Sequence, residues 1–217
     1  MDQPSPQLPR DRDLQLLAIL IDGVIAQKCR RHYRADTQEH QLSSRIAEAI
    51  ESEIGRIRIG ETWVEIVVQE LPDRGRGSKE KKVGADLYVS IVIDDGREVI
   101  SKGLLVQSKW DDTLKDSGLT EQAEEMRRRT KDGYVWAYGP EGVAVYPANE
   151  DALMAARRGA TGGTVGELLS EGAACRAGDT GIGRDTTKPI VDSLNEILNE
   201  LSADTALSLL LRTSPPV

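Results

Sequence analysis

Three polar side chains stand at the ends of two neighbouring apolar segments of the chain. Asp86 comes directly before residues 87–93, and Gln107 and Lys109 follow the run Leu-Leu-Val at 104–106. Gln107 and Lys109 are two positions apart, so they project to the same face of an extended strand. Polar groups in a buried strand are costly unless they are paired or used. Asp86, Gln107 and Lys109 are therefore candidate functional residues.

These residue types suit the hydrolysis of a phosphodiester. The carboxylate of Asp86 and the amide oxygen of Gln107 are hard ligands for a divalent cation such as Mg²⁺ or Mn²⁺, which polarises phosphate and activates water. Lys109 can orient that water or stabilise the charge that develops on the phosphate. We expect Asp86→Ala and Lys109→Ala each to abolish cleavage with little loss of stability. The competing interpretation makes Gln107 structural, donating a buried hydrogen bond through its amide NH₂.

The two segments resemble the motif of the PD-(D/E)xK nuclease superfamily, which includes many restriction endonucleases. The matching residues are Gly-Ala-Asp at 84–86 and Val-Gln-Ser-Lys at 106–109, in the variant whose second half has Gln in place of the acidic residue. No proline precedes Asp86, unlike the family pattern. The resemblance covers about residues 37–148. It implies a Mg²⁺- or Mn²⁺-dependent endonuclease that hydrolyses DNA, with a role in restriction or anti-phage defence.

Nucleases of this type commonly draw a further acidic residue from the helix before the sheet. Glu39 lies seven positions before Ile46, about two helical turns, and so falls on the buried stripe, whereas Glu48 faces away. The resemblance therefore makes Glu39 the third metal ligand, after Asp86 and Gln107. Glu53 lies on the same stripe at the far end of the helix and is kept in reserve. The alternative is that Glu39 completes a capping box with Asp36 as N-cap.

Gln122 is a further candidate, on the helix expected after the third strand. It lies four positions before Met126 and three after Leu119, near the apolar face of that helix. Some Gln-variant nucleases are similar in having a polar residue that faces the site from this helix. The alternative is a flanking residue whose amide binds a backbone carbonyl.

Hydrophobic periodicity and turn residues predict the elements that position these side chains. The expected order is helices at 13–32 and 38–54, strands at 62–69, 85–93 and 98–110, a helix capped by Ser117, a hairpin of 134–138 with 142–146, and a helical remainder at 149–211 around a Gly-rich loop at 178–183. This order predicts an α/β fold with a mixed central sheet of about five strands flanked by helices. We expect a restriction-endonuclease-like core with helical additions at both ends.

The length of 217 residues favours one domain. Residues 1–10 are rich in proline and polar residues and are expected to be a disordered lead. Residues 11–217 are then a single nuclease-like domain, with its core at about 37–148 and a C-terminal helical extension at 149–211. Charged residues make up 29% and the AVILMFWYC set 39%, which is typical of a globular protein.

A net charge of −8 argues against nonspecific coating of nucleic acid. Basic residues gather at 74–82 and 127–131, where they form either a local positive strip or solvated faces. Two cysteines far apart predict no disulfide framework and fit a reducing cytoplasm. The longest apolar stretch, 14–26, is well short of the roughly 20 residues that span a bilayer. The segment before it lacks the cationic character of a signal peptide, so we expect neither export nor membrane insertion.

DNA is the expected partner, and a homodimer is expected because one small subunit attacks one strand at a time. The resemblance also allows other defence-system subunits. The C-terminal apolar positions form either a dimer interface or a surface packed on the protein's own sheet: Ile190, Leu194, Ile197, Leu198 and Leu201. A second hypothesis is a catalytically inactive, nuclease-like module that binds nucleic acid or a partner protein, favoured by Gln107 and the acidic net charge.

Overall fold

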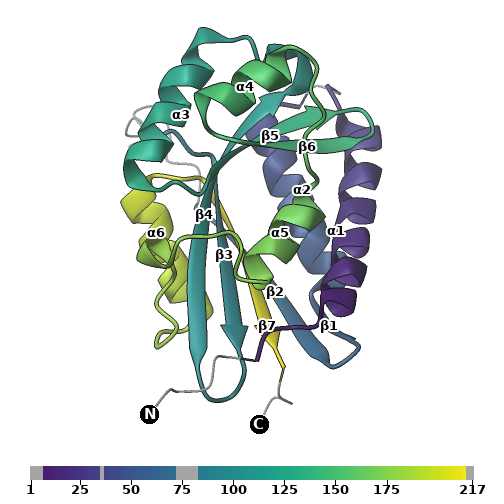
Figure 1. The fold of residues 1–217 in the computed structure, drawn as a ribbon, viewed down its shortest axis with the longest axis vertical. Coiled ribbons are helices and arrows are strands. Elements are labelled where there is room, and N and C mark those ends of the chain that lie inside the picture. Colours follow the sequence, from purple (N-terminus) through teal and green to yellow (C-terminus); the bar gives the residue numbers. More distant parts are fainter. Residues whose placement is uncertain (1–6, 35–36, 72–82, 214–217) are drawn as a thin grey trace.

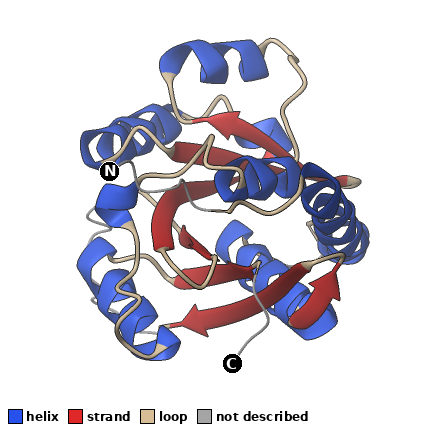
Figure 2. Ribbon diagram, turned by 60° about the horizontal axis from the view of Figure 1, so that its bottom comes forward, coloured by secondary structure: helices blue, strands red, loops and turns tan. Residues whose placement is uncertain are grey.

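The computed structural model describes residues 7–34, 37–71 and 83–213. These residues form a seven-stranded mixed sheet with helices on both faces (Figures 1 and 2). The strands are β1 (Arg56–Ile59), β2 (Thr62–Glu70), β3 (Leu87–Asp94), β4 (Val99–Trp110), β5 (Gly133–Gly139), β6 (Gly142–Pro147) and β7 (Thr205–Arg212). The helices are α1 (Asp11–His32), α2 (Glu39–Ile54), α3 (Ser117–Arg129), α4 (Glu150–Arg157), α5 (Val165–Ala173) and α6 (Ile190–Leu201), with short 3₁₀ turns η1 (Asp111–Thr113) and η2 (Thr180–Ile182).

The strand order is β1-β2-β7-β3-β4-β5-β6. Strands β3 and β4 form an antiparallel hairpin in which Leu87 pairs with Val106. After α3 the chain returns as β5, which is parallel to β4 and pairs Val135 with Gln107. The end of β4 and the start of β3 therefore lie together at the edge of the sheet that is formed by strand ends, near Gln122 of α3.

The predicted fold class is confirmed, but the sheet has more strands than the five expected. Strand β1 was not predicted. Strand β7 lies in the stretch predicted to be helical, and it is inserted between β2 and β3, parallel to β3. Its side chains are buried on both faces from Thr205 to Leu211, so it has no alternation of apolar and polar residues. A leucine-rich run without that alternation was therefore mistaken for helix.

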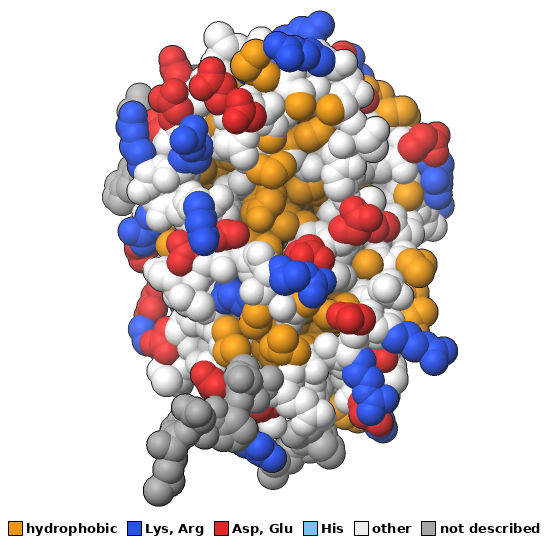
Figure 3. Space-filling model, viewed as in Figure 1, with side chains coloured by type: hydrophobic (Ala, Val, Ile, Leu, Met, Phe, Trp, Pro, Cys, Tyr) orange, Lys and Arg blue, Asp and Glu red, His pale blue; other side chains and the backbone are white. Residues whose placement is uncertain are grey.

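The helices divide into two layers, each with its own core. The layer of α1, α2 and α5 covers one face of the sheet, and the layer of α3, α4 and α6 covers the other. In α6, Leu194, Leu198 and Leu201 are buried in the second core, so these three pack on the protein's own sheet. On the face shown in Figure 3, acidic and basic side chains are interspersed around apolar groups.

Two local expectations need correction. The N-cap of α3 is Asp116, whose side chain accepts a hydrogen bond from the Gly118 N–H, and Ser117 is the first helical residue. Residues 7–10, expected to belong to a disordered lead, contact the body of the protein. The Gln7 N–H donates to Asp95 Oδ2 over 2.8 Å, and Thr213 Oγ1 donates to the Gln7 carbonyl over 3.3 Å. These residues therefore form part of the domain.

No helix in the described part of the chain combines the length and the apolar character needed to cross a membrane. The basic run expected at 74–82 lies outside the described residues. The other run, at 127–131, forms the end of α3 and the loop after it, with Arg127, Arg128 and Lys131 exposed.

Candidate active site at the end of β4

Asp86 and Gln107 are in direct contact in the protein interior. The Asp86 N–H donates to the Val106 carbonyl over 2.8 Å, which fixes the start of β3 against β4. Asp86 Oδ2 then accepts two hydrogen bonds, from Gln107 Nε2 at 2.6 Å and from the Ser108 N–H at 2.9 Å. Only 6% of Asp86 and 3% of Gln107 is exposed. The pair predicted from sequence spacing therefore exists as a buried, hydrogen-bonded unit.

These contacts correct the expectation that Asp86→Ala leaves stability nearly unchanged. Removal of the carboxylate deprives a buried backbone N–H and a buried amide NH₂ of their acceptor. Each unsatisfied donor costs about 1–3 kcal/mol. Asp86→Asn keeps an oxygen at this position, and it is therefore the appropriate variant for tests of function.

The amide of Gln107 is satisfied on one side only. Its Nε2 donates to Asp86 and also to the Ser108 carbonyl over 3.1 Å. Its Oε1 is buried and has no hydrogen-bond partner in the described part of the chain. The NH₂ group thus donates buried hydrogen bonds, which is the structural role that the competing interpretation assigns to Gln107. The oxygen stays available to a cation or a water molecule, which is the role of a ligand.

Lys109 lies on the same face of β4 as Gln107 and as Leu105, which is buried in the core beneath α3, α4 and α6. It pairs in register with Ala137 of β5 and is partly exposed. Lys109 is thus a partly exposed cation two positions along the strand from Gln107. This position suits contact with an anionic substrate.

The backbone of α3 packs directly against the turn before Asp86. Gly84 has a φ of +64°, and a Cβ at this position would lie 2.6 Å from the Gln122 carbonyl oxygen. The side-chain Oε1 of Gln122 is buried and has no hydrogen-bond partner among the described residues. Gln122 therefore lies beside the segment that contains Asp86, and a second amide oxygen in this region lacks a partner.

Glu39 reaches the same edge of the sheet from the opposite face. It is the first residue of α2, and its Oε1 accepts a hydrogen bond of 3.3 Å from the Trp110 N–H, next to Lys109. The N-cap of α2 is Gln38, and its reciprocal partner is Gln41. The capping-box role proposed for Glu39 is therefore wrong, while Asp36 lies outside the described residues. Glu48 and Glu53 are exposed.

A hydroxyl network that the sequence analysis missed fastens α2 to β4. Ser43 Oγ shares hydrogen bonds of 2.7 Å with Ser108 Oγ and with the Tyr138 hydroxyl. Burial raises the pKa of Tyr138 to about 12, so its hydroxyl stays protonated and can donate. Ser43 follows Glu39 by four residues and lies on the same stripe as Ile46, so the helical period could have identified it.

All five predicted residues gather around the end of β4, although by different contacts. Asp86 and Gln107 touch, Lys109 shares the face of Gln107, Glu39 binds the next backbone N–H, and Gln122 packs on the turn before Asp86. No group of three or more His, Cys, Asp and Glu side chains in residues 7–34, 37–71 and 83–213 is arranged to hold a metal ion. The oxygen donors match Mg²⁺ or Mn²⁺ in type, but their low charge predicts weak binding.

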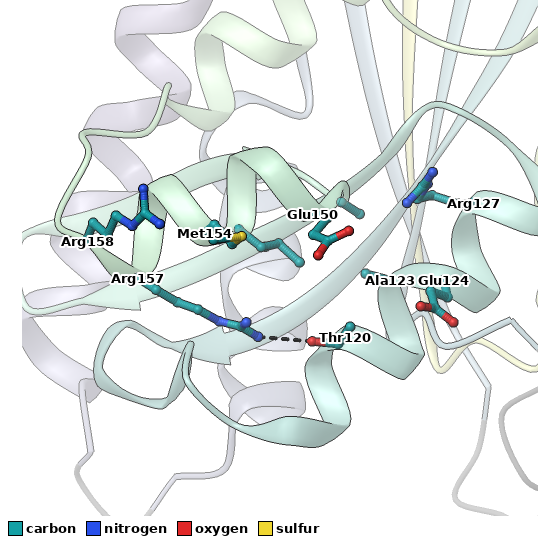
Figure 4. Close-up of a pocket in the computed structure, with 10 residues that line it drawn as sticks. Thr120, Ala123, Glu124, Arg127, Glu150, Met154, Arg157 and Arg158 are labelled. Atoms are coloured by element: carbon teal, nitrogen blue, oxygen red, sulfur yellow. Dashed lines mark hydrogen bonds between the residues drawn. The ribbon is translucent and has the colours of Figure 1, made fainter.

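A pocket of about 430 Å³ lies elsewhere, between α3 and α4 (Figure 4). Its lining includes Thr120, Arg127, Glu150 and Arg157, and the Arg157 Nη2 donates to Thr120 Oγ1 over 3.1 Å. None of the five predicted residues lines it. Charges of both signs and a flexible methionine make this pocket a poor match for a phosphodiester site.

No protein-family model, curated protein or solved structure matches this chain. The case for a function therefore rests on the residues at the end of β4 and on their chemistry.

Proposed function

We propose that this protein is a metal-dependent nuclease that hydrolyses phosphodiester bonds of DNA. The observation that carries the proposal is the buried contact of Asp86 with Gln107. The amide oxygen of Gln107 has no partner among the described residues, and Gln107 lies two positions along the strand from the partly exposed Lys109. Asp86, Gln107 and Glu39 would hold Mg²⁺ or Mn²⁺. The bound cation would polarise the phosphate and activate water.

The protein's own side chains supply the remaining chemistry. Lys109 binds a phosphate oxygen and stabilises the negative charge that develops there during attack. Gln122 Oε1, which is buried without a hydrogen-bond partner among the described residues, accepts a hydrogen bond from the attacking water and orients it. The two hydrogen bonds to Asp86 Oδ2 hold its carboxylate in place, which lowers the cost of positioning it for each turnover.

The opposite face of β4 provides rigidity. The Ser43, Ser108 and Tyr138 hydroxyls fix the first turns of α2 relative to β4, and Glu39 is one turn before Ser43. A carboxylate on a helix that is hydrogen-bonded to the strand is better positioned than one on a loop. Glu39 and Lys109 therefore stay in a fixed relationship across the edge of the sheet.

A second candidate function is an inactive nuclease-like module that binds nucleic acid or a partner protein. The observation that favours it is the Gln107 NH₂ group, which already occupies Asp86 Oδ2 and contributes no negative charge. A calorimetric titration with Mn²⁺ separates the two functions. One Mn²⁺ site that Asp86→Asn removes supports the nuclease, and a folded protein with no site supports the inactive module.

The direct test is incubation of the purified protein with supercoiled, linear and single-stranded DNA and with RNA, in Mg²⁺, Mn²⁺ or chelator. We expect nicked or linear products from DNA that depend on the cation. Equal activity in chelator contradicts the role of the metal. Preferential cleavage of RNA would retain the chemistry but change the substrate.

The biological setting follows from the same proposal. We expect two copies to act together on duplex DNA, since each site cuts one strand. Action in the cytoplasm, within restriction or anti-phage defence and with other subunits of such a system, is the setting that the motif resemblance implies. Size-exclusion chromatography with light scattering, with and without DNA, tests the dimer.

A further inference from the structure

A group of cationic side chains lies where the end of α1 meets α2. Lys28 and Arg31 belong to the last turns of α1, and Arg45 belongs to α2. Arg31 and Arg45 are exposed, and Lys28 is partly exposed. Arg45 Nη1 contacts His32 Nδ1 at 3.1 Å and donates to Thr37 Oγ1 over 3.4 Å, which ties α2 to the end of α1. We call Lys28, Arg31 and Arg45 the basic cluster.

The side chains of the basic cluster differ from nearby arginines in their ion pairing within the described residues. Nearby arginines are paired, since Arg30 lies 3.6 Å from Glu141 and Arg34 binds Asp112. No such ion pair involves Lys28, Arg31 or Arg45 within the described ranges of the chain. Three cations without an ion pair among the described residues thus lie together on one surface of a protein whose net charge is −8.

The three charges are close enough to act on one imidazole ring. Partial burial lowers the pKa of His32, and the charges of Arg45, Lys28 and Arg31 lower it further. A ring that gains a proton less readily because of its neighbours lies in a positive local potential. The same potential attracts anions.

The basic cluster adjoins the candidate active site through Tyr33, the residue after His32. The ring of Tyr33 meets that of Trp110 edge-on, with centroids 5.4 Å apart, and its hydroxyl donates to Asp111 Oδ1 over 2.7 Å. Trp110 follows Lys109 and donates its N–H to Glu39. The end of α1 is therefore attached to the same edge of the sheet as the five site residues.

We propose that the basic cluster binds the phosphate backbone of nucleic acid and directs it to the site at the end of β4. This inference rests on the proposed function for the identity of the ligand. Long cationic side chains that form no ion pair with a described carboxylate suit phosphates, because binding releases the counterions of the nucleic acid. Contacts to phosphate fix the position of the nucleic-acid backbone without reading its bases, so we assign the cluster a positioning role. Binding is therefore salt-dependent and independent of sequence.

Fluorescence anisotropy with a labelled DNA duplex in chelator tests the basic cluster without cleavage. The variant is Arg31→Glu with Arg45→Glu in the full chain. The matched control is Arg127→Glu with Arg128→Glu at the exposed end of α3, which changes the net charge equally. We expect the first variant to bind roughly tenfold more weakly or worse, with the slope of log K against log salt reduced by about 2. The control is expected to stay within about twofold of the parent.

Several results would overturn the inference. These are an unchanged affinity in the first variant, an equal loss in the control, no binding of duplex by the parent, or competition by polyglutamate as strong as that by DNA at equal charge. Polyglutamate competition would instead indicate an acidic protein partner. Arg31→Gln with Arg45→Gln, which adds no repulsion, should lose an intermediate amount, and thermal melting verifies folding of both variants.

The outcome also separates this inference from the proposed catalysis. If the parent cleaves DNA while the basic-cluster variant binds and cleaves normally, the binding surface is wrong and the nuclease stands. If binding falls as expected but no cation supports cleavage by the parent, the surface stands and the catalytic proposal is wrong.

Discussion

Asp86 Oδ2 accepts a hydrogen bond of 2.6 Å from the side-chain amide of Gln107, and both residues are almost fully buried. An acidic residue at position 107 could not make this bond when ionised, because a carboxylate has no donor. Glutamine therefore donates to the Asp86 side chain, while its own Oε1 has no hydrogen-bond partner among the described residues. The position combines a structural donor and a free oxygen in one side chain.

Gln107→Glu separates these two roles. Without a cation the new carboxylate loses a charge-assisted hydrogen bond and lies against Asp86, so stability should fall by about 1.5–3 kcal/mol. With Mn²⁺ the two carboxylates can share the ion. Mn²⁺ should therefore raise the melting temperature of Gln107→Glu by more than it raises that of the parent. Thermal melts of parent, Gln107→Glu and Gln107→Ala across a Mn²⁺ series measure this. No recovery in the Glu variant argues against a ligand at this position.

Glu39→Gln tests the contribution of α2. Glutamine keeps an oxygen that can accept from the Trp110 N–H, so folding should be preserved, whereas the negative charge near Lys109 is lost. We expect the cleavage rate to drop by roughly tenfold or more, in the range that single electrostatic groups contribute. Glu48→Gln, on the exposed face of the same helix, should cleave at the parental rate. Equal rates for the two variants remove Glu39 from the site.

Gly84→Ala tests the packing of α3 beside Asp86. The positive φ and the contact with the Gln122 backbone make alanine costly, by about 2 kcal/mol or more. Gly23→Ala is the control, because a Cβ on this exposed position of α1 meets nothing within 4 Å. It should raise stability by about 1 kcal/mol. Urea denaturation measures both, and a neutral Gly84→Ala would show that the turn before Asp86 tolerates movement.

The Asp95 carboxylate makes the free energy of unfolding depend on pH in the acid range. Backbone N–H groups of Gln7, Glu98 and Arg97 lower its pKa to about 2. Because the folded pKa lies below the unfolded value, this contribution is complete above about pH 4 and is lost as pH falls towards 2. Asp95→Asn should therefore be less stable than the parent at pH 6, and the difference should shrink between pH 4 and 2. A difference that is constant with pH assigns the effect to something other than the Asp95 charge.

The hairpin and the placement of its polar side chains could be predicted from sequence because local patterns determine them. Turn residues separate β3 from β4, and the two-residue spacing of Gln107 and Lys109 puts both on one face whatever surrounds the strand. The helical period likewise distinguished Glu39 from Glu48. These inferences needed no information about long-range contacts.

The insertion of β7 between β2 and β3 could not be predicted in this way. Its leucines are compatible with a helix, and only the neighbouring strands on both sides make the extended form favourable. The two hydrogen bonds to Asp86 Oδ2 depend on the register of β3 and β4, which the residue pattern does not specify. The contact of Gly84 with Gln122 depends in turn on where α3 crosses the sheet.

Cleavage of supercoiled plasmid in Mn²⁺ by the parent and by Lys109→Met, side by side, tests the proposed nuclease most directly. Lys109 is partly exposed, so its replacement should leave the fold and Mn²⁺ binding intact while removing the charge that stabilises the phosphate. Lys115→Met, at an exposed position in the loop after β4, is the control. We predict nicked and linear products from the parent and the control. The cleavage rate of Lys109→Met should be lower by about a hundredfold or more, the loss typical of one electrostatic contact to the transition state. Equal cleavage by Lys109→Met, or no cleavage by the parent, would contradict a nuclease site at the end of β4.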